Sequence, residues 1–135
     1  MRERAITGVY ETVLYADDVE AMKAFYEDVL GLRLVDGPDE LSAAFRLPDG
    51  GVLLVFHPGR SGQPSRAVPS HGAHGTGHVA FRIPPGTHDE WRHALLEHGV
   101  VVEREVEWPR GGRSLYVRDP AGNSVELTAD EIWPA

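Results

Sequence analysis

The chain has 135 residues, a formal net charge of −8 and no cysteine. This length suits one domain, the charge argues against a nucleic-acid or anionic-membrane partner, and the lack of thiols excludes disulfides, cysteine nucleophiles and sulfur-ligated metals. The N-terminus carries no apolar signal-peptide core, and the longest apolar run, Val52–Phe56, is far too short to span a membrane. We therefore expect a soluble, cytoplasmic protein with a single domain over residues 1–135.

The first half of the chain reads as a strand, a helix and three further strands. Asp17 or Asp18 offers a helix N-cap, apolar residues follow at three- and four-residue steps, and Gly31 is placed to end the helix. Runs rich in β-branched and aromatic residues on either side indicate strands. The expected elements are a strand at 6–15, a helix at about 19–30, and strands at 32–35, 43–47 and 52–56.

The same order returns after a loop rich in Gly, Pro, Ser and His. This loop, residues 58–76, shows no hydrophobic period, which predicts a linker or a lid. Thr87 and Glu90 fit a capping box at the start of a second helix, and Gly99 is placed to stop it. The expected strands lie at 78–83 and 100–102, and a final hairpin at 113–128 turns at 119–123. The chain thus divides into two βαβββ modules, about 6–57 and 77–129.

Aligning the two modules pairs residues that carry chemistry. When the turn prolines of the two hairpins are superposed, Leu54 in the first module takes the place of Glu126 in the second. Counting from the helix-stopping glycines makes Glu11 and His78 near-equivalents. Three of these four positions therefore hold side chains that can bind a metal ion, and Glu126 interrupts an otherwise apolar strand, where a charge is costly to bury.

The segments Asp18–Leu32, Gly77–Phe81 and Asp119–Leu127 resemble the vicinal oxygen chelate superfamily, which includes glyoxalase I, fosfomycin- and bleomycin-resistance proteins, and extradiol dioxygenases. The resemblance covers nearly the whole chain. It implies an α+β fold in which two βαβββ modules in tandem form curled mixed sheets around a central cavity. It also implies a homodimer, a small-molecule substrate, and a divalent metal ion held by His78 and Glu126.

Two positions depart from the pattern of the superfamily. Glu11 stands where a first-strand histidine is frequent, and Leu54 cannot supply the fourth ligand that glyoxalase I-like proteins commonly have. The expected metal set is thus Glu11, His78 and Glu126, which suits Mn, Fe, Co, Ni or Zn with places open for substrate oxygens. We expect a lyase, isomerase or dioxygenase acting on vicinal oxygens, with Glu11 and Glu126 catalytic. If His78 and Glu126 alone hold the metal, Glu11 is a candidate general base.

A metal-free binding protein of the bleomycin-resistance type is the alternative. In that interpretation Glu11 and His78 hydrogen-bond one another, and a drug or metabolite is sequestered unchanged. Arg113 and Tyr116, on the strand next to that of Glu126, are candidate binding residues for an anionic or phenolic substrate. The alternative for these two side chains is structural, with Arg113 exposed at a strand edge and Tyr116 in the core.

The remaining histidines are assigned smaller roles. His71 and His74 lie in the loop between the modules, as candidates for a lid or an outer contact to the site. Three others recur every five residues on the second helix and do not share a face, so we expect them to be solvated; they are His88, His93 and His98.

Overall fold

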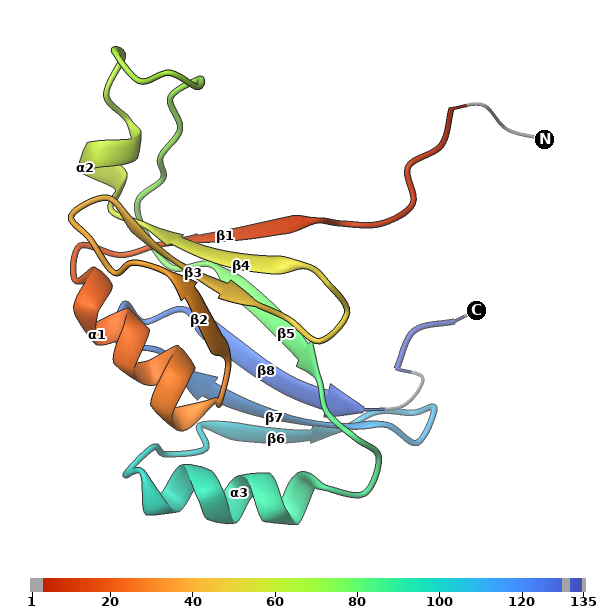
Figure 1. Ribbon diagram of the computed structural model, residues 1–135. Coiled ribbons are helices and arrows are strands. Elements are labelled where there is room, and N and C mark those ends of the chain that lie inside the picture. Colours follow the sequence, from red (N-terminus) through yellow and green to blue (C-terminus); the bar gives the residue numbers. More distant parts are fainter. Residues whose placement is uncertain (1–3, 130–131, 135) are drawn as a thin grey trace. The chain divides into compact units, whose positions relative to one another are not determined.

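The computed structural model describes residues 4–129 and 132–134, which fold as two compact units. The first unit ends at Ala73 and the second begins at His74. Each unit contains four strands in one mixed sheet, with a helical segment after its first strand (Figure 1). The predicted α+β class and the two βαβββ modules are confirmed, whereas the curled sheets and the central cavity stay predictions.

The first unit is built on the sheet order β1-β4-β3-β2 (Figure 1). Strands β1 and β4 are parallel, and the other neighbouring pairs are antiparallel. The helical segment after β1 is α1, which contacts β3 and β4. The elements are β1 Glu11–Tyr15, α1 Val19–Ala24, a π-helical turn η1 Phe25–Val29, β2 Arg33–Asp36, β3 Ser42–Arg46, β4 Val52–Phe56 and the short helix α2 Pro58–Ser61.

The start and end of the first helical segment follow the predicted signals. The Asp18 side chain accepts a hydrogen bond from the Ala21 backbone N–H at 3.0 Å, which makes Asp18 the N-cap. Met22 and Tyr26 on its apolar face are fully buried. Gly31 adopts a φ of 74°, a left-handed conformation that favours glycine, and this ends the segment where the sequence indicated.

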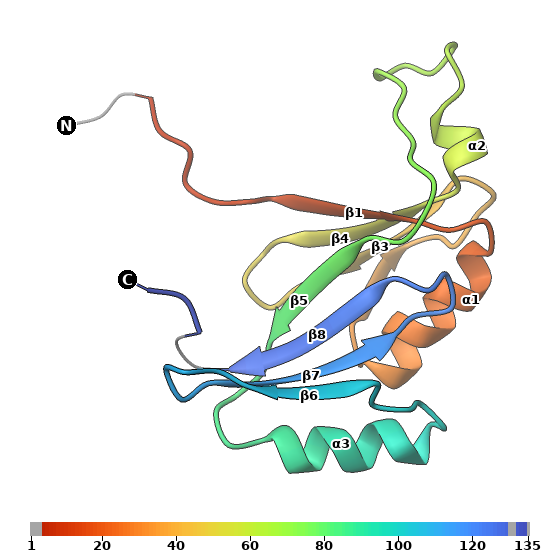
Figure 2. The same cartoon turned by 180° about the vertical axis from the view of Figure 1, so that it is seen from behind.

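The second unit repeats this plan with the sheet order β5-β8-β7-β6, seen from the other side in Figure 2. Strands β5 and β8 are parallel, and the helix α3 contacts β7 on one face of the sheet. The elements are β5 His78–Arg82, α3 His88–Glu97, β6 Arg104–Glu107, β7 Arg113–Arg118 and β8 Ser124–Ala129.

Two local predictions in the second unit are wrong. The strand expected at 100–102 lies instead at Arg104–Glu107, because its register is set by the tight hairpin into β7, where Trp108 and Gly112 bond through their backbones at 2.7 Å. The capping box does not form either. Thr87 is the N-cap residue of α3, but its hydroxyl donates to the Pro84 carbonyl at 2.7 Å, so the helix gains no side-chain cap from it.

Strand register confirms the predicted equivalence of the two modules. Glu11 lies opposite Val52 on the parallel pair of the first unit, and His78 lies opposite Ser124 at the same place in the second. Two residues further along the last strands stand Leu54 and Glu126. Arginine side chains also repeat a contact. Arg46 donates to the Gly50 carbonyl at 2.9 Å, and Arg118 donates to the Gly122 carbonyl at 3.0 Å.

The loop after β4 is tied to the first unit. His71 Nδ1 in this loop forms a 2.7 Å hydrogen bond with the Tyr15 hydroxyl. The His71 ring also packs edge-on against the Phe56 ring. The Ser61 hydroxyl donates to the His71 carbonyl at 2.7 Å. His71 therefore anchors the loop, whereas His74 is exposed and belongs to the second unit. In the part of the chain that the structure describes, no helix is long and apolar enough to cross a membrane.

Candidate functional site

His78 and Glu126 meet on neighbouring strands of the second unit. His78 is the first residue of β5, and Glu126 lies in the middle of β8, on the same face of the sheet. The distance from His78 Nε2 to Glu126 Oε1 is 3.2 Å. The Glu126 side chain is 7% exposed and that of His78 is 50% exposed, so a buried carboxylate faces a ring that solvent can reach. Both predicted ligands of this unit are thus brought together.

The proton of the neutral His78 ring is fixed by a backbone contact. His78 Nδ1 lies 3.0 Å from the Ser124 carbonyl oxygen, which can only accept, so Nδ1 carries the proton. Nε2 of the neutral ring then has a lone pair and no proton, and it faces Glu126 Oε1, which in an ionised carboxylate can also only accept. Two acceptors at this distance are satisfied either by a proton shared between them or by a metal ion that both bind. Two ligands about 2.1 Å from one ion, about 90–110° apart, are separated by roughly 3.0–3.4 Å.

The second carboxylate oxygen of Glu126, Oε2, accepts a hydrogen bond from a buried serine. Ser114 on β7 donates its hydroxyl to Glu126 Oε2 at 2.5 Å, and Trp108 donates its indole N–H to the same hydroxyl at 2.9 Å. Ser114 is fully buried. The sequence interpretation missed both residues. The signal was present, because side chains on a strand alternate between faces, and Ser114 shares the parity of Tyr116, which lies directly opposite Glu126.

Tyr116 lies beside the pair and lines a pocket of about 480 Å³. Its ring stacks on the His78 ring, with centroids 6.3 Å apart and planes tilted by 25°. Burial, and then the nearby Glu126 carboxylate, raise the pKa of the Tyr116 hydroxyl above its ordinary value. Arg104 and Arg118 line the same pocket. Arg118 pairs with Glu103 at 3.1 Å, whereas Arg104 forms no ion pair within the described residues of the second unit.

Arg113 lies apart from this group, on the face of the sheet that α3 covers. It contacts Asp89 at 3.4 Å and Glu105 at 3.3 Å. The Arg92 hydrogen bond and charge, followed by the Arg113 charge, lower the pKa of Asp89 below its ordinary value. Arg113 is three residues from Tyr116, so the two side chains point to opposite faces. A substrate-binding role for Arg113 stays a prediction, while its ion pairs give it a structural role.

Glu11 occupies the equivalent of the His78 position in the first unit. It is exposed at the start of β1, and within the described residues of that unit its carboxylate forms no hydrogen bond or ion pair. Leu54, the equivalent of Glu126, is partly buried on the same sheet face. Within either unit, the described residues contain no cluster of three His, Asp or Glu side chains able to hold a metal ion. The three-ligand set therefore stays a prediction.

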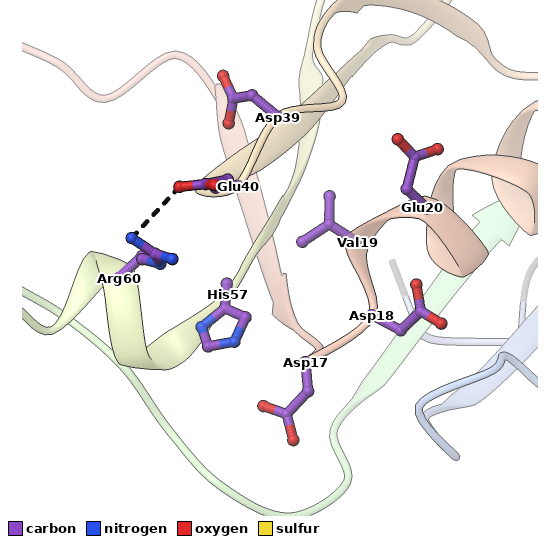
Figure 3. A pocket seen from close by; sticks show the side chains of 8 residues that line it. All are labelled: Asp17, Asp18, Val19, Glu20, Asp39, Glu40, His57 and Arg60. Carbon is purple, nitrogen blue, oxygen red and sulfur yellow. Dashed lines mark ion pairs between the residues drawn. The ribbon is translucent and has the colours of Figure 1, made fainter.

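An acidic pocket of about 600 Å³ lies on the first unit. Figure 3 shows Asp17 and Asp18 just before α1 and Glu20 in its first turn, with Asp39 and Glu40 on a separate turn and Arg60 paired to Glu40. The Asp18 carboxylate caps α1, and Asp39 accepts from two backbone N–H groups of its own turn. Asp18 and Asp39 therefore serve local turns, and Glu40 is paired with Arg60 at 3.3 Å, so we assign this acidic pocket no functional role.

The expectation that the three α3 histidines are solvated is wrong for one of them. His88 is 4% exposed, and its Nε2 donates to the Arg113 carbonyl at 2.8 Å. It sits in the first turn of α3, which lies close to β7, so the ring is enclosed between helix and sheet. His93 is exposed and contacts Glu97 at 3.1 Å, and His98 is exposed at the end of the helix.

Comparison with known proteins identifies relatives of this chain. The family model of the Glyoxalase/Bleomycin resistance protein/Dioxygenase superfamily matches residues 8–127. The crystal structure of a lactoylglutathione lyase from Agrobacterium tumefaciens matches with a TM-score of 0.90 and 38% identity, covering 96% of this chain and 98% of that one. A glyoxalase/dioxygenase from Nostoc punctiforme has a TM-score of 0.70 at 24% identity, covering 96% of this chain and 95% of that one, which shows a shared fold.

A curated relative extends the comparison to a longer protein. "Putative ring-cleaving dioxygenase MhqE" of Bacillus subtilis (strain 168) is 30% identical over an alignment of 108 residues, and the match covers 73% of this chain. This chain spans about a third of that protein, since the match covers 34% of its length. The family model reaches from the segment before β1 into β8 and so includes both units. The chain is therefore a member of the Glyoxalase/Bleomycin resistance protein/Dioxygenase superfamily.

Proposed function

We propose that this protein is a divalent-metal-dependent enzyme of the lyase, isomerase or dioxygenase kind, acting on a small molecule with vicinal oxygens. One observation carries the proposal. The Nε2 lone pair of His78 and the Oε1 oxygen of Glu126 face each other at 3.2 Å, with the ring proton held on the far nitrogen by a carbonyl. This donor pair fits two neighbouring positions around a first-row divalent ion.

The ligands in this proposal are His78, Glu126 and Glu11. Glu11 is assigned because β1 and β5 are equivalent strands and Glu11 holds the position of His78. One imidazole and two carboxylates suit Mn, Fe, Co, Ni or Zn. Leu54 offers no oxygen or nitrogen, so the proposed set has three protein ligands and leaves places for two substrate oxygens.

The chain's own residues would bind and orient the substrate. When bound, the metal would supply Lewis-acid polarisation of the two substrate oxygens. Tyr116 lines the neighbouring pocket of about 480 Å³, and its hydroxyl is protonated at neutral pH, so it can donate a hydrogen bond to a substrate oxygen. Arg104 in the same pocket supplies a positive charge for an anionic group. Where Glu11 is not a ligand, its carboxylate is the proposed acceptor of a substrate proton.

Metal analysis tests the proposal. The protein should be purified without a chelator or a histidine tag, and its metal content measured before and after addition of Mn, Ni or Zn. We expect about one equivalent, with sharply weaker uptake in Glu126→Gln and weaker uptake in Glu11→Gln. Glu107→Gln is the matched control, because Glu107 is an exposed strand carboxylate of the second unit. Less than about a tenth of an equivalent, not recovered on adding metal, would rule the enzyme proposal out.

Activity assays can then narrow the reaction. The relative from Agrobacterium tumefaciens is named a lactoylglutathione lyase and the one from Bacillus subtilis a ring-cleaving dioxygenase. We therefore propose lactoylglutathione formation and cleavage of an aromatic vicinal diol as the first two reactions to measure. Loss of turnover in Glu126→Gln, with the fold retained, is the expected result for whichever reaction applies.

A metal-free binding protein is the second candidate. Two observations favour it: Leu54 stands in place of a ligand, and a protonated His78 would satisfy Glu126 Oε1 without any metal. Calorimetry on chelator-treated protein with a cationic antibiotic such as bleomycin separates the two candidates. Tight binding that is unchanged by metal supports sequestration.

Size-exclusion chromatography with light scattering tests the proposed homodimer, for which we expect twice the mass of the chain.

A further inference from the structure

We propose that Ser114 and Trp108 are positioning residues that determine which oxygen of Glu126 is available to a metal ion. They hold Oε2 by a hydrogen-bond chain and leave Oε1 free beside His78 Nε2, so that Glu126 binds through one oxygen only. This inference rests on the proposed function, because it concerns the coordination mode of a ligand named there. Neither residue contacts the His78 ring.

The chain of contacts runs inward from Glu126. Ser114 Oγ lies 2.5 Å from Glu126 Oε2, and Trp108 Nε1 lies 2.9 Å from Ser114 Oγ. Ser114 is fully buried and Glu126 is 5% exposed, so water does not compete for these groups. Trp108 follows β6, Ser114 lies on β7 and Glu126 on β8, so two neighbouring strands and the turn before them supply the hydrogen-bond chain.

The direction of each hydrogen bond follows from which groups have protons. The indole N–H of Trp108 can only donate, so Ser114 Oγ accepts from it. Ser114 has a single proton of its own, and two oxygens lie within reach of it, Glu126 Oε2 at 2.5 Å and Thr128 Oγ1 at 3.1 Å. The ionised carboxylate is the stronger acceptor and the nearer one. Thr128 donates its own proton to the Arg113 carbonyl at 3.2 Å, so toward Ser114 it can only accept, and as a neutral hydroxyl it is the weaker of the two acceptors.

This arrangement limits how Glu126 can bind a cation. Coordination through both oxygens would require Oε2 to give up a short, charge-assisted hydrogen bond in a buried site. Donation from Trp108 polarises the Ser114 hydroxyl and strengthens that bond further. Oε1 instead points toward His78 Nε2, 3.2 Å away. Groups that orient a metal ligand in this way commonly change metal affinity by about 10–100-fold when removed.

The experiment compares metal affinity and coordination mode in four proteins. Dissociation constants for Zn and Mn are measured by calorimetry for the wild type, Ser114→Ala, Trp108→Phe and Thr128→Val, each shown to be folded by circular dichroism in chelator. We expect Ser114→Ala to weaken binding by about 10–100-fold. Trp108→Phe, which removes only the N–H from an aromatic ring, should weaken binding less than Ser114→Ala does. Thr128→Val is the matched control, since it removes a neighbouring hydroxyl outside the chain, and its affinity should stay within about threefold of the wild type.

Infrared difference spectra on metal addition give a readout that loss of packing would not move. The separation of the two carboxylate stretching bands is wide for binding through one oxygen and narrow for binding through both. We expect the wide pattern in the wild type and a narrower one in Ser114→Ala, where Oε2 is released.

The outcomes separate this inference from the proposed function. If the wild type binds metal and neither variant changes affinity or band separation, the positioning role is wrong while the metal site stands. If Thr128→Val weakens binding as much as Ser114→Ala does, the effect is general to the polar cluster and the inference is also wrong. A wild type that binds no metal overturns both proposals. Should Ser114→Ala fail to fold, Trp108→Phe decides the question by the same two measurements.

Discussion

Replacement of Asn123 by alanine should destabilise the second unit and disturb the placement of His78. The Asn123 side chain is 2% exposed and joins two strands at their start. Its Oδ1 accepts from the Gly77 backbone N–H at 2.7 Å, and its Nδ2 donates to Asp119 Oδ2 at 2.9 Å. Gly77 directly precedes His78, so this contact fixes where β5 begins against β8.

The magnitude follows from the two hydrogen bonds that alanine removes. The bond to the Gly77 N–H is a neutral one, for which about 0.5–1.5 kcal/mol is typical, and the bond to the Asp119 carboxylate contributes about 1.5–3 kcal/mol. Asp119 keeps its bonds to the Ala121 and Asn123 backbone N–H groups. The expected loss in the free energy of unfolding is therefore about 2–4 kcal/mol, or about 6–15 °C in Tm for a chain of this size.

Thermal unfolding by circular dichroism, together with amide hydrogen exchange, measures this loss. The expected exchange pattern is faster exchange at Gly77 and along β5 and β8, with the strands of the first unit unaffected. Metal affinity should fall as well, because the Ser124 carbonyl that fixes the His78 proton follows Asn123 directly. A loss below about 1 kcal/mol, or a uniform loss of protection in both units, would refute the reasoning.

The first unit supplies the matched control. Strand register makes Gly51 the equivalent of Asn123. The backbone hydrogen bond from Val52 N to the Tyr10 carbonyl is 2.8 Å long. It repeats the 2.9 Å bond from Ser124 N to the Gly77 carbonyl in the second unit. The turn is held there by Asp49, which is exposed and accepts from the Gly51 N–H at 2.8 Å. Because this carboxylate is exposed to water, Asp49→Ala should cost less than the about 1.5–3 kcal/mol typical of a hydrogen bond to a charged group, and so less than Asn123→Ala does.

Three further predictions concern other parts of the molecule. Arg92→Gln should raise the pKa of Asp89, measured by carboxyl NMR titration, more than Arg113→Gln does, because the Arg92 hydrogen bond is the largest cause of the lowered pKa. The stability that this contact contributes is present above the ordinary Asp pKa and is lost as the pH falls through the lowered pKa of Asp89. Tyr15→Phe removes the 2.7 Å hydrogen bond to His71 and should speed proteolysis within residues 62–70 without changing metal uptake. Equal cleavage rates in Tyr15→Phe and the wild type would contradict the anchoring role of His71. Zn or Mn at a hundredfold excess over Kd should raise the free energy of unfolding of the wild type by about 2.7 kcal/mol and leave that of His78→Gln almost unchanged, as measured by thermal unfolding. Equal stabilisation of both proteins would remove His78 from the ligand set.

Much of the fold follows from local signals in the sequence. Apolar residues at helical spacing, Asp18 as a cap and Gly31 as a stop place the first helical segment, and repetition of the same order identifies the second module. The errors lie where tertiary contacts decide. The valines at 100–102 have a higher strand propensity than Arg104–Glu107, yet the hairpin turn at Trp108–Gly112 sets which residues pair with β7.

The candidate site was predictable only in part. Module equivalence selects His78 and Glu126 correctly as neighbours, since it depends on strand register alone. Ser114 and Trp108 escape this reasoning because a serine on a strand, or a tryptophan in the turn after one, has many ordinary explanations. Arg113 and Tyr116 are predicted together because both lie on the strand next to that of Glu126, although a separation of three residues places them on opposite faces of β7.

The two units share a backbone plan and differ in what their equivalent positions carry. On the strand face that holds Glu126, the second unit has Tyr116 and Thr128, whereas the first unit has Ala44, Leu54 and Phe56 at the matching places. The duplicated register therefore gives each unit the same cross-strand geometry, but only the second surrounds a carboxylate with a hydroxyl, an imidazole and a phenol. A buried carboxylate is costly without such partners. The polar network of the second unit is thus what allows Glu126 to stand where the first unit has leucine.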